Sequence, residues 1–371
     1  MDDNGPHGAM LMPDIMGRIA YATPCERCKY RWDHCYCKGK RDIMCLVCKP
    51  WRQAVLDSAT TLRNSFAGLY DERLGVPHGM NHDQIRTLNI WTPHYDDDEP
   101  PRPMPVLSEF NKLHKLYIDF SCGNNVTLFI PKEILGIQSL RELELLCPML
   151  ESLDVISAAT QLTMLHLEGL IISNPKGTSL KELSGLTGLR DLTINHIRLH
   201  DYDSDSDSEE DLQIRTHYEL RHLSPLVNLT RLIFNEFDDP NSLEVIAQNF
   251  TALEVLRFDC SQGGWPFSPG LSIRSDLNPL SACVSLRELS FTWTNIKDIS
   301  ALASLTNLET LDLRKNNLLM TESIRSLSRL STLKKLILTN CDSITYLSSL
   351  SHLPIINCSF DCASFSFCKC G

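Results

Sequence analysis

The sequence predicts an α/β solenoid with a parallel sheet on its concave face, preceded by a small all-helical domain. Three observations predict this fold. One leucine motif recurs along most of the chain, a second motif recurs ahead of its copies, and the first residues have the apolar spacing of short helices. Self-similarity with a period of about 20–50 residues is typical of stacked structural repeats.

The clearest copy of the leucine motif is LETLDLRKNNL, residues 308–318. It follows the pattern L-x-x-L-x-L-x-x-N-x-L, with the defined positions Leu308, Leu311, Leu313, Asn316 and Leu318. The neighbouring copies are LRELSFTWTNI, which starts at Leu286, and LKKLILTNCDSI, which starts at Leu333 and carries Cys341 in place of the asparagine.

Eleven copies of the motif are predicted, most of them 20–28 residues apart. They start at Ile85, Leu113, Leu140, Leu162, Leu189, Leu229, Leu253, Leu286, Leu308, Leu333 and Leu353. Two intervals are wider, and each contains an insertion: DYDSDSDSEED after Leu199 and SQGGWPFSPG after Cys260.

The stretch before several copies also repeats, as in ELSGLTGLRDL, HLSPLVNLTRL, DISALASLTNL and SLSRLSTLKKL. Together the two motifs resemble the leucine-rich repeat family, over residues 80–360. In x-L-x-L-x the leucines of a strand point inward, and one repeat cannot bury them alone. The asparagine can satisfy backbone groups of neighbouring coils. The leucines, together with Cys147 and Cys341, are therefore predicted to be packing residues.

Residues 8–66 are predicted to form a helical domain. Pro13 fits a helix start, Ile15 and Ile19 share one apolar helical face, and Asp42 is a natural N-cap for a second helix. Pro50 would end that helix and begin a third. The segments LMPDIMGRI and RDIMCLVCKPWR resemble the opening and the closing signature of the F-box.

The F-box resemblance implies a function. The chain would be the non-catalytic substrate-recognition subunit of a Skp–cullin–F-box ubiquitin ligase, with the repeats binding the target. The residues that would dock the Skp-type adaptor, and through it the cullin, are Pro13, Ile15, Ile19, Leu46, Val47 and Trp51. The alternative is a cytosolic repeat scaffold or phosphatase-regulatory protein without ligase association, because the 22-residue rhythm of NIKDISALASLTNLETLDL resembles such regulators.

A cysteine-rich insert, residues 24–40, departs from the F-box pattern. It carries Cys25, Cys28, Cys35 and Cys37, which could bind one zinc ion tetrahedrally or stay reduced in a loop. Cys45 and Cys48 instead fit helix packing. The tail, residues 361–371, is a second cysteine-rich segment, read as a cap or as a metal or redox site. No other cofactor is predicted.

The acidic insertion contains Ser204, Ser206 and Ser208, each with an acidic residue three positions later. That spacing resembles the preference of acid-directed casein kinases. A solvated loop without modification is the alternative reading, since runs of like charge favour disorder.

The repeat register also identifies the residues that point outward from the strands. Toward the N-terminal half they include Glu142, Glu144, Glu168 and Asp191. The predicted target-binding residues lie toward the C-terminal half: Arg231, Arg257, Trp293, Arg314 and Lys335. Arginine pairs strongly with carboxylate and phosphate, so the target would be acidic or phosphorylated. Ordinary solvated strand residues are the alternative.

The net charge of −11 argues against nucleic acid as a partner, and against a zinc-bearing nucleic-acid module. No apolar run approaches the length of a membrane span. The first residues, MDDNGPHGAMLMPDIMGRIA, lack the pattern of a signal peptide. We therefore expect a protein of the cytoplasm or nucleus, with reduced thiols.

Overall fold

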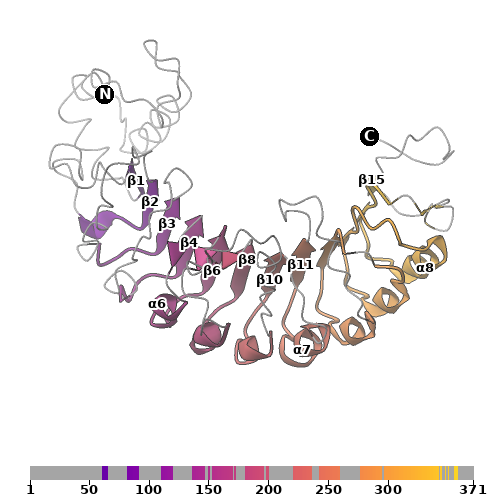
Figure 1. The fold of residues 1–371 in the computed structure, drawn as a ribbon, viewed down its shortest axis with the longest axis horizontal. Helices are drawn as coiled ribbons and strands as arrows, with labels where there is room; N and C mark the ends of the chain where they lie inside the picture. The colour runs from indigo at the N-terminus through magenta and orange to yellow at the C-terminus, as the bar shows by residue number, and fades with distance from the viewer. Residues whose placement is uncertain are drawn as a thin grey trace, which may run out of the picture.

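The computed structural model describes residues 61–65, 82–91, 110–119, 136–146, 149–150, 153–169, 171–172, 180–195, 198–199, 220–235, 242–259, 276–294, 296–341, 343–344, 347, 350 and 355–357. These residues form one curved solenoid (Figure 1). The strands line its inner, concave side, and the short helices lie along its outer, convex side. The predicted fold, a leucine-rich-repeat solenoid with a parallel sheet on the concave face, is confirmed.

Twelve strands of the described chain form the sheet, each paired in parallel with the strand of the next coil. Eleven of them are the predicted copies of the motif, and each begins two residues after the leucine or isoleucine that starts the copy. The strands are β1 (Thr61–Ser65), β2 (Thr87–Trp91), β3 (Lys115–Asp119), β4 (Glu142–Leu146), β6 (Met164–Glu168), β8 (Asp191–Asn195), β10 (Arg231–Asn235), β11 (Val255–Asp259), β12 (Glu288–Thr292), β13 (Thr310–Asp312), β14 (Lys335–Ile337) and β15 (Ile355–Asn357).

The sheet begins earlier than the sequence predicts. β1 lies within residues 8–66, the range predicted to be helical, and it pairs in parallel with β2. The register places Leu62 beside Leu88, but it places Asn64 beside Ile90. Because the sequence has a polar residue, Asn64, where the other strands of the motif have an apolar one, apolar alternation does not reveal this strand. Residues 8–60 of the predicted helical domain and the tail, residues 361–371, lie outside the described residues.

The two insertions leave the sheet continuous. Arg231 of β10 is in register with Asp191 of β8, although the acidic insertion lies between them in sequence. Val255 of β11 is likewise in register with Glu288 of β12 across the second insertion. Each coil therefore stacks directly on its neighbour, and the extra residues do not interrupt the ladder.

The convex side carries short helices, most of them of the 3-10 type. Their bounds are η3 (His82–Gln84), α6 (Asp154–Ser157), η4 (Leu180–Gly185), η5 (Leu220–Leu223), α7 (Ser242–Asn249), η6 (Asn278–Ala282), η7 (Ser300–Ser304), α8 (Thr321–Ile324) and η8 (Arg325–Arg329). None of the helices in the described part of the chain is long and apolar enough to cross a membrane.

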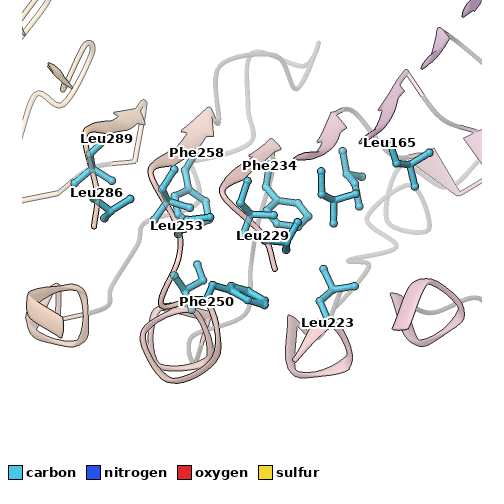
Figure 2. Packing of buried hydrophobic residues seen from close by; sticks show 14 of the residues in the cluster. Leu165, Leu223, Leu229, Phe234, Phe250, Leu253, Phe258, Leu286 and Leu289 are labelled. Carbon is cyan, nitrogen blue, oxygen red and sulfur yellow. The ribbon is translucent and has the colours of Figure 1, made fainter. Parts of the chain in front are cut away.

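The core fills the space between these helices and the sheet (Figure 2). In one coil the inward residues are Leu180, Leu183, Leu186, Leu189, Leu192 and Ile194, and none is more than 2% exposed. A 3-10 helix has about three residues per turn, so leucines three apart share a face. In the strand that follows, every second side chain points inward. The spacing of inward residues thus changes from three in the 3-10 helix to two in the strand. This change explains the motif that the sequence repeats ahead of each strand.

Phenylalanine replaces leucine at the second inward strand position of three consecutive coils. Phe234, Phe258 and Phe291 are in register across β10, β11 and β12 and are almost fully buried. The rings of Phe258 and Phe291 stack with centroids 5.4 Å apart and planes 2° from parallel. The aromatic rings thus continue the core between neighbouring coils.

A second sheet was not predicted. It consists of β5 (Met149–Leu150), β7 (Ile171–Ile172) and β9 (Arg198–Leu199), in that parallel order. Strands of two residues are too short for alternation to identify them in a sequence.

The asparagine of the clearest motif joins two coils. Asn316 is fully buried, and its Nδ2 donates to the carbonyl oxygens of Phe291 at 2.6 Å and Leu313 at 2.9 Å. Its Oδ1 accepts from the backbone N–H groups of Thr294 and Ile296, both at 3.2 Å. The predicted role of the amide is confirmed.

Cys341 occupies the same position in the next coil. It is fully buried, and its Sγ donates to the carbonyl oxygen of Leu313 at 3.0 Å. Its predicted packing role is confirmed, whereas Cys147 lies outside the described residues. A thiol is a weak donor with no amide oxygen, so it replaces only part of the asparagine's hydrogen bonding.

One leucine of the motif does not point inward. Leu318 is 47% exposed, whereas the following residue, Leu319, is fully buried. The backbone N–H of Leu319 donates to the carbonyl oxygen of Asn316 at 3.1 Å and closes a turn there. The prediction of Leu318 as a packing residue is therefore wrong, and this turn is the reason.

A second set of polar side chains links the turns ahead of the strands. Asn228 donates to the carbonyl oxygen of Thr187 in the preceding coil at 2.9 Å, and Asn307 donates in the same way to Val284 at 2.9 Å. Ser139, Ser285 and Thr332 repeat this contact with the carbonyl oxygens of Asn111, Thr251 and Thr306. Side chains therefore join several coils to the preceding one ahead of the strand, and Asn316 and Cys341 do so after it.

Replacing Asn316 with alanine should destabilise the solenoid by about 3 kcal/mol, because it leaves several buried backbone N–H and C=O groups without a hydrogen-bond partner. The adjacent Asn317 is exposed, so Asn317→Ala should change the free energy of unfolding by less than about 0.5 kcal/mol. Urea unfolding followed by circular dichroism measures both variants. Equal stability of the two would show that the buried amide does not join the coils.

Candidate target-binding surface

The outward residues of the strands form the concave surface. The predicted target-binding residues all lie on it or at its edge: Arg231 in β10, Arg257 in β11, Lys335 in β14, Trp293 directly after β12 and Arg314 after β13. Parallel register brings them to neighbouring strands, so residues far apart in sequence share one surface.

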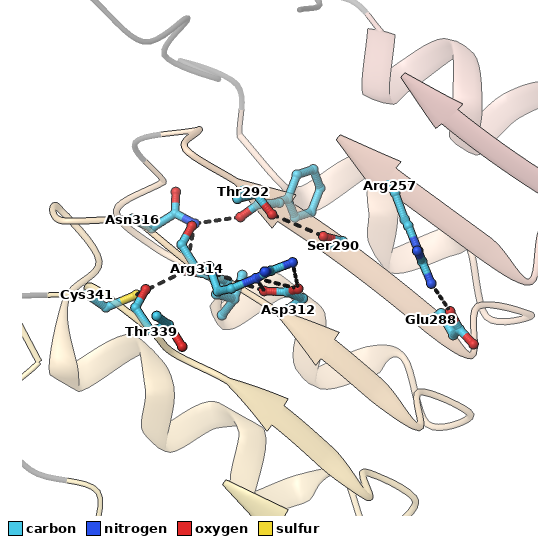
Figure 3. A network of polar contacts seen from close by, with 11 residues as sticks. Arg257, Glu288, Ser290, Thr292, Asp312, Arg314, Asn316, Thr339 and Cys341 are labelled. Carbon is cyan, nitrogen blue, oxygen red and sulfur yellow. Dashed lines mark hydrogen bonds and ion pairs between the residues drawn. The ribbon is translucent and has the colours of Figure 1, made fainter. Parts of the chain in front are cut away.

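The three arginines are not free cations. Arg257 Nη2 lies 2.8 Å from Glu288 Oε2 on the next strand, and Arg231 Nε lies 3.5 Å from Asp191 Oδ2 on the previous one (Figure 3 includes the first pair). Burial raises the pKa of Asp191, although the charge of Arg231 opposes that effect. These pairs bridge adjacent coils, which gives both arginines a structural role as well as an outward position.

Arg314 is the most tightly engaged of the three. Its Nε and Nη2 donate to the carboxylate of Asp312 at 2.8–3.0 Å (Figure 3). Asp312 is only 7% exposed. Removing the guanidinium would leave a buried carboxylate without its counter-charge, which is costly. Arg314 therefore cannot be reversed in charge as a simple test of target binding.

The predicted basic half is closer to neutral than the sequence indicated. The outward positions of β12 and β13 also hold Glu288 and Asp312, which the predicted set of charged residues did not include. The repeat register that places the arginines on the surface places these carboxylates beside them. The basic residue of the predicted set for which the described residues provide no carboxylate partner is Lys335.

The N-terminal half of the surface is strongly acidic. The outward positions of β3, β4, β6 and β8 carry five carboxylates: Asp119, Glu142, Glu144, Glu168 and Asp191. Lys115 is the one lysine or arginine among these strand positions, and it reaches Glu144 at 2.5 Å and Glu142 at 3.3 Å. His166 Nε2 lies 3.3 Å from Glu168.

These charges shift the ionisation of their neighbours. Partial burial lowers the pKa of Lys115, but the hydrogen bonds and charges of Glu144 and Glu142 outweigh it, so the pKa is raised. The pKa of Tyr117 is raised by partial burial and then by the charges of Asp119 and Glu144. The sequence reading identified the carboxylates but not Lys115 or Tyr117, which occupy equivalent outward positions on β3.

Trp293 has an unusual backbone conformation. Its φ is 61°, a left-handed value that a bulky residue rarely adopts. Two later coils have the same conformation at the equivalent position, Lys315 with φ 61° and Asn340 with φ 56°. An earlier coil places Gly169 there, with φ 66°. The turn after the strand thus requires a left-handed residue, and tryptophan is the least suited of the four.

The side chain of Trp293 contributes little to the core, because the residue is 40% exposed. Lys315 lies over its indole ring, with Nζ 4.4 Å from the ring centroid. A cation–π contact at an exposed site contributes about 0.5–1 kcal/mol. The sequence analysis placed Trp293 on the surface but did not include Lys315. The position of Lys315, directly before the asparagine of the motif, is the feature of the sequence that indicates its place in the turn.

The other predicted sites lie outside the described residues. These are the adaptor-binding residues Pro13, Ile15, Ile19, Leu46, Val47 and Trp51, the cysteines Cys25, Cys28, Cys35 and Cys37, and the serines Ser204, Ser206 and Ser208. Within the part of the chain that the structure describes, no three histidine, cysteine or acidic side chains are grouped to hold a metal ion.

Comparison with known proteins gives structural neighbours but no family assignment. No family model matches the sequence, and no curated protein matches it. Among solved structures, the chain is similar to an internalin (inlF) from Listeria monocytogenes, with 20% identity over 83% of this chain and 88% of that one and a TM-score of 0.44. It is also similar to internalin C2 from the same organism, with 18% identity over 64% and 88% of the two chains and a TM-score of 0.43.

Lys115→Ala should destabilise the protein by about 1 kcal/mol at neutral pH, because it leaves Glu142 and Glu144 without their counter-charge. Folding raises the pKa of Lys115 above 10.5, so this stabilisation is complete at neutral pH and is lost as the pH rises through the folded-state pKa. It should also vanish in acid, where the two carboxylates are protonated.

Chemical unfolding at acidic, neutral and strongly alkaline pH measures this difference. Lys112→Ala is the matched control, since Lys112 is exposed and has no ion pair within the described residues. A loss of stability in Lys115→Ala that is the same at every pH would contradict the electrostatic explanation.

Proposed function

We propose that this protein is a non-catalytic substrate receptor of a Skp–cullin–F-box ubiquitin ligase, in which the solenoid binds the target. The observation that supports target binding is the continuous sheet, which holds a broad, charged and outward-facing surface on twelve paired strands. Solenoids commonly use such extended concave surfaces to bind other proteins. The ligase role is supported by the resemblance of RDIMCLVCKPWR to the F-box.

In this proposal the two parts of the chain have different partners. Leu46, Val47 and Trp51, with Pro13, Ile15 and Ile19, contact the Skp-type adaptor and through it the cullin. The solenoid holds the target near a separate transferring enzyme, which raises the effective concentration of the target's lysines. The chain needs no catalytic residue of its own, and it acts in the cytoplasm or nucleus.

The position of β1 sets a condition on this proposal. The helical domain must end before Thr61, and nine residues, 52–60, separate Trp51 from that strand. A connection of this length spans at most about 32 Å even when it is fully extended. The adaptor would therefore be held close to the acidic end of the solenoid.

A second candidate is a repeat scaffold or phosphatase-regulatory protein without ligase association. The observation that favours it is the regular 22-residue interval between the coils that start at Leu286 and Leu308, each with a 3-10 helix on the convex side. Copurification of the Skp-type adaptor with the full chain distinguishes the candidates, because a scaffold without ligase association would not bring it down.

The cysteine insert is proposed to be dispensable for adaptor binding, with zinc as its one possible cofactor. Deleting residues 25–38 should preserve copurification of the adaptor. Elemental analysis of the full chain should give about one zinc per chain if Cys25, Cys28, Cys35 and Cys37 bind metal, since structural zinc is held tightly. Metal-free full chain would exclude the zinc reading.

Leu46→Asp or Trp51→Ala should abolish copurification of the Skp-type adaptor. Such interfaces depend on a few apolar anchors, and loss of one costs about 2 kcal/mol or more. The circular dichroism spectrum and thermal unfolding of the solenoid should be unchanged. Leu318→Asp, at an exposed leucine of the solenoid, is the matched control and should retain the adaptor. Normal adaptor recovery with both variants would reject the F-box assignment.

A further inference from the structure

Three of the five large apolar side chains that are exposed on the described chain lie on two adjacent coils: Trp293 at 40%, Leu318 at 47% and Met320 at 46%. The backbones of these coils are bonded together along this edge. Trp293 N–H donates to the carbonyl oxygen of Arg314 at 3.1 Å, and Met320 N–H donates to that of Lys297 at 3.0 Å. We name Trp293, Lys297, Lys315, Leu318 and Met320 the tryptophan edge.

The charges of the tryptophan edge are unbalanced. Lys297 and Lys315 have no carboxylate partner among the described residues. Three of the carboxylates of the same two coils have an arginine or lysine partner: Glu288 pairs with Arg257, Glu309 with Arg287 and Lys334, and Asp312 with Arg314. Asp298 accepts hydrogen bonds from Ser300 at 2.9 and 3.0 Å, and Glu322, two residues after Met320, is exposed and has no ion pair among the described residues. The edge thus presents two ammonium groups that no carboxylate of the described chain neutralises, and that of Lys315 lies over the ring of Trp293.

The conformation of Trp293 is a second, independent observation. Its position requires a left-handed backbone, which an earlier coil satisfies with Gly169. Tryptophan adopts this conformation with strain, and burial of its ring in the core does not offset the strain, because the residue is exposed. Strained residues of this kind cluster at functional sites, where the surrounding structure holds them in place.

We propose that the tryptophan edge is the docking site for an extended acidic segment of a partner protein, whose carboxylates bind Lys297 and Lys315 and whose apolar side chain packs on Trp293. The acidic N-terminal half of the concave surface repels the same segment, which confines it to the C-terminal coils. This inference rests on the proposed function only in taking the solenoid as the target-binding part. The target would be acidic, and Lys297, Lys315 and Trp293, rather than the paired arginines, would make the main contacts with it.

The probe is a short fluorescein-labelled peptide of aspartate and glutamate with two central leucines, titrated with the full chain and followed by fluorescence anisotropy. Two further peptides replace its acidic residues with lysine or with phosphoserine. The acidic peptide should bind, and its affinity should fall as salt is added. The lysine peptide should bind more weakly than the acidic one.

Trp293→Gly should reduce the affinity roughly tenfold or more, while the melting temperature stays the same or rises because the backbone strain is relieved. A purely structural tryptophan would give the opposite result. Val284→Asn is the control, since Val284 is 52% exposed on the turn ahead of β12, and it should bind as the wild type does.

Lys297→Glu combined with Lys315→Glu should abolish binding of the acidic peptide. Lys112→Glu combined with Arg329→Glu makes the same change in net charge at exposed residues away from the edge, and it should have no such effect. The proposal is overturned if the wild type fails to bind the acidic peptide at millimolar concentration, if the lysine or phosphoserine peptide binds more tightly, or if both edge variants bind like the wild type. Adaptor copurification is measured separately, so failure of the F-box proposal would not be confused with failure here.

Discussion

No coil of this solenoid can bury its own leucines, and the rest of the structure depends on that constraint. Each coil presents inward residues such as Leu186, Leu189 and Leu192, which become fully buried only when coils stack on both sides. Stacking also brings polar backbone groups into the interior, where they need partners. Asn316 provides partners for two coils at once, and Asn228 and Asn307 join the turns at the other end of the strands. Burial and hydrogen bonding are thus coupled from one coil to the next.

The same coupling defines what the surface can recognise. Because the strands are locked in register, outward side chains are held in rows across coils, and oppositely charged neighbours such as Arg257 and Glu288 pair with each other. Pairing removes those groups from the set available to a partner. The N-terminal half keeps a surplus of carboxylates, because Lys115 is the one lysine or arginine at the outward positions of β3, β4, β6 and β8. Near Trp293, Lys297 and Lys315 have no carboxylate partner among the described residues. We therefore expect a partner protein to bind where the outward charges of a coil are not neutralised by its neighbours.

The sequence predicted the parts of the fold that depend on local periodicity. Eleven strand positions and the role of Asn316 follow from spacing alone. It failed at Thr61–Ser65, where Asn64 breaks the alternation, and at Leu318, where a turn brings Leu319 inward instead. The arginines of the predicted surface were placed correctly, but their carboxylate partners come from neighbouring coils and were overlooked. The strain at Trp293 could not be predicted, because it is a property of the backbone rather than of the residue pattern.

Hydrogen–deuterium exchange of backbone amides in the full chain tests most directly whether the coils form one continuous solenoid. The amide of Arg231 donates to Arg190 across the acidic insertion at 2.9 Å, and that of Glu288 donates to Glu254 across the second insertion at 3.0 Å. Both should be as strongly protected as the amide of Thr310, which donates to Arg287 at 2.9 Å between coils without an insertion. Rapid exchange at Arg231 and Glu288 with slow exchange at Thr310 would contradict the account, because the chain would then consist of separate stacks that open at the insertions.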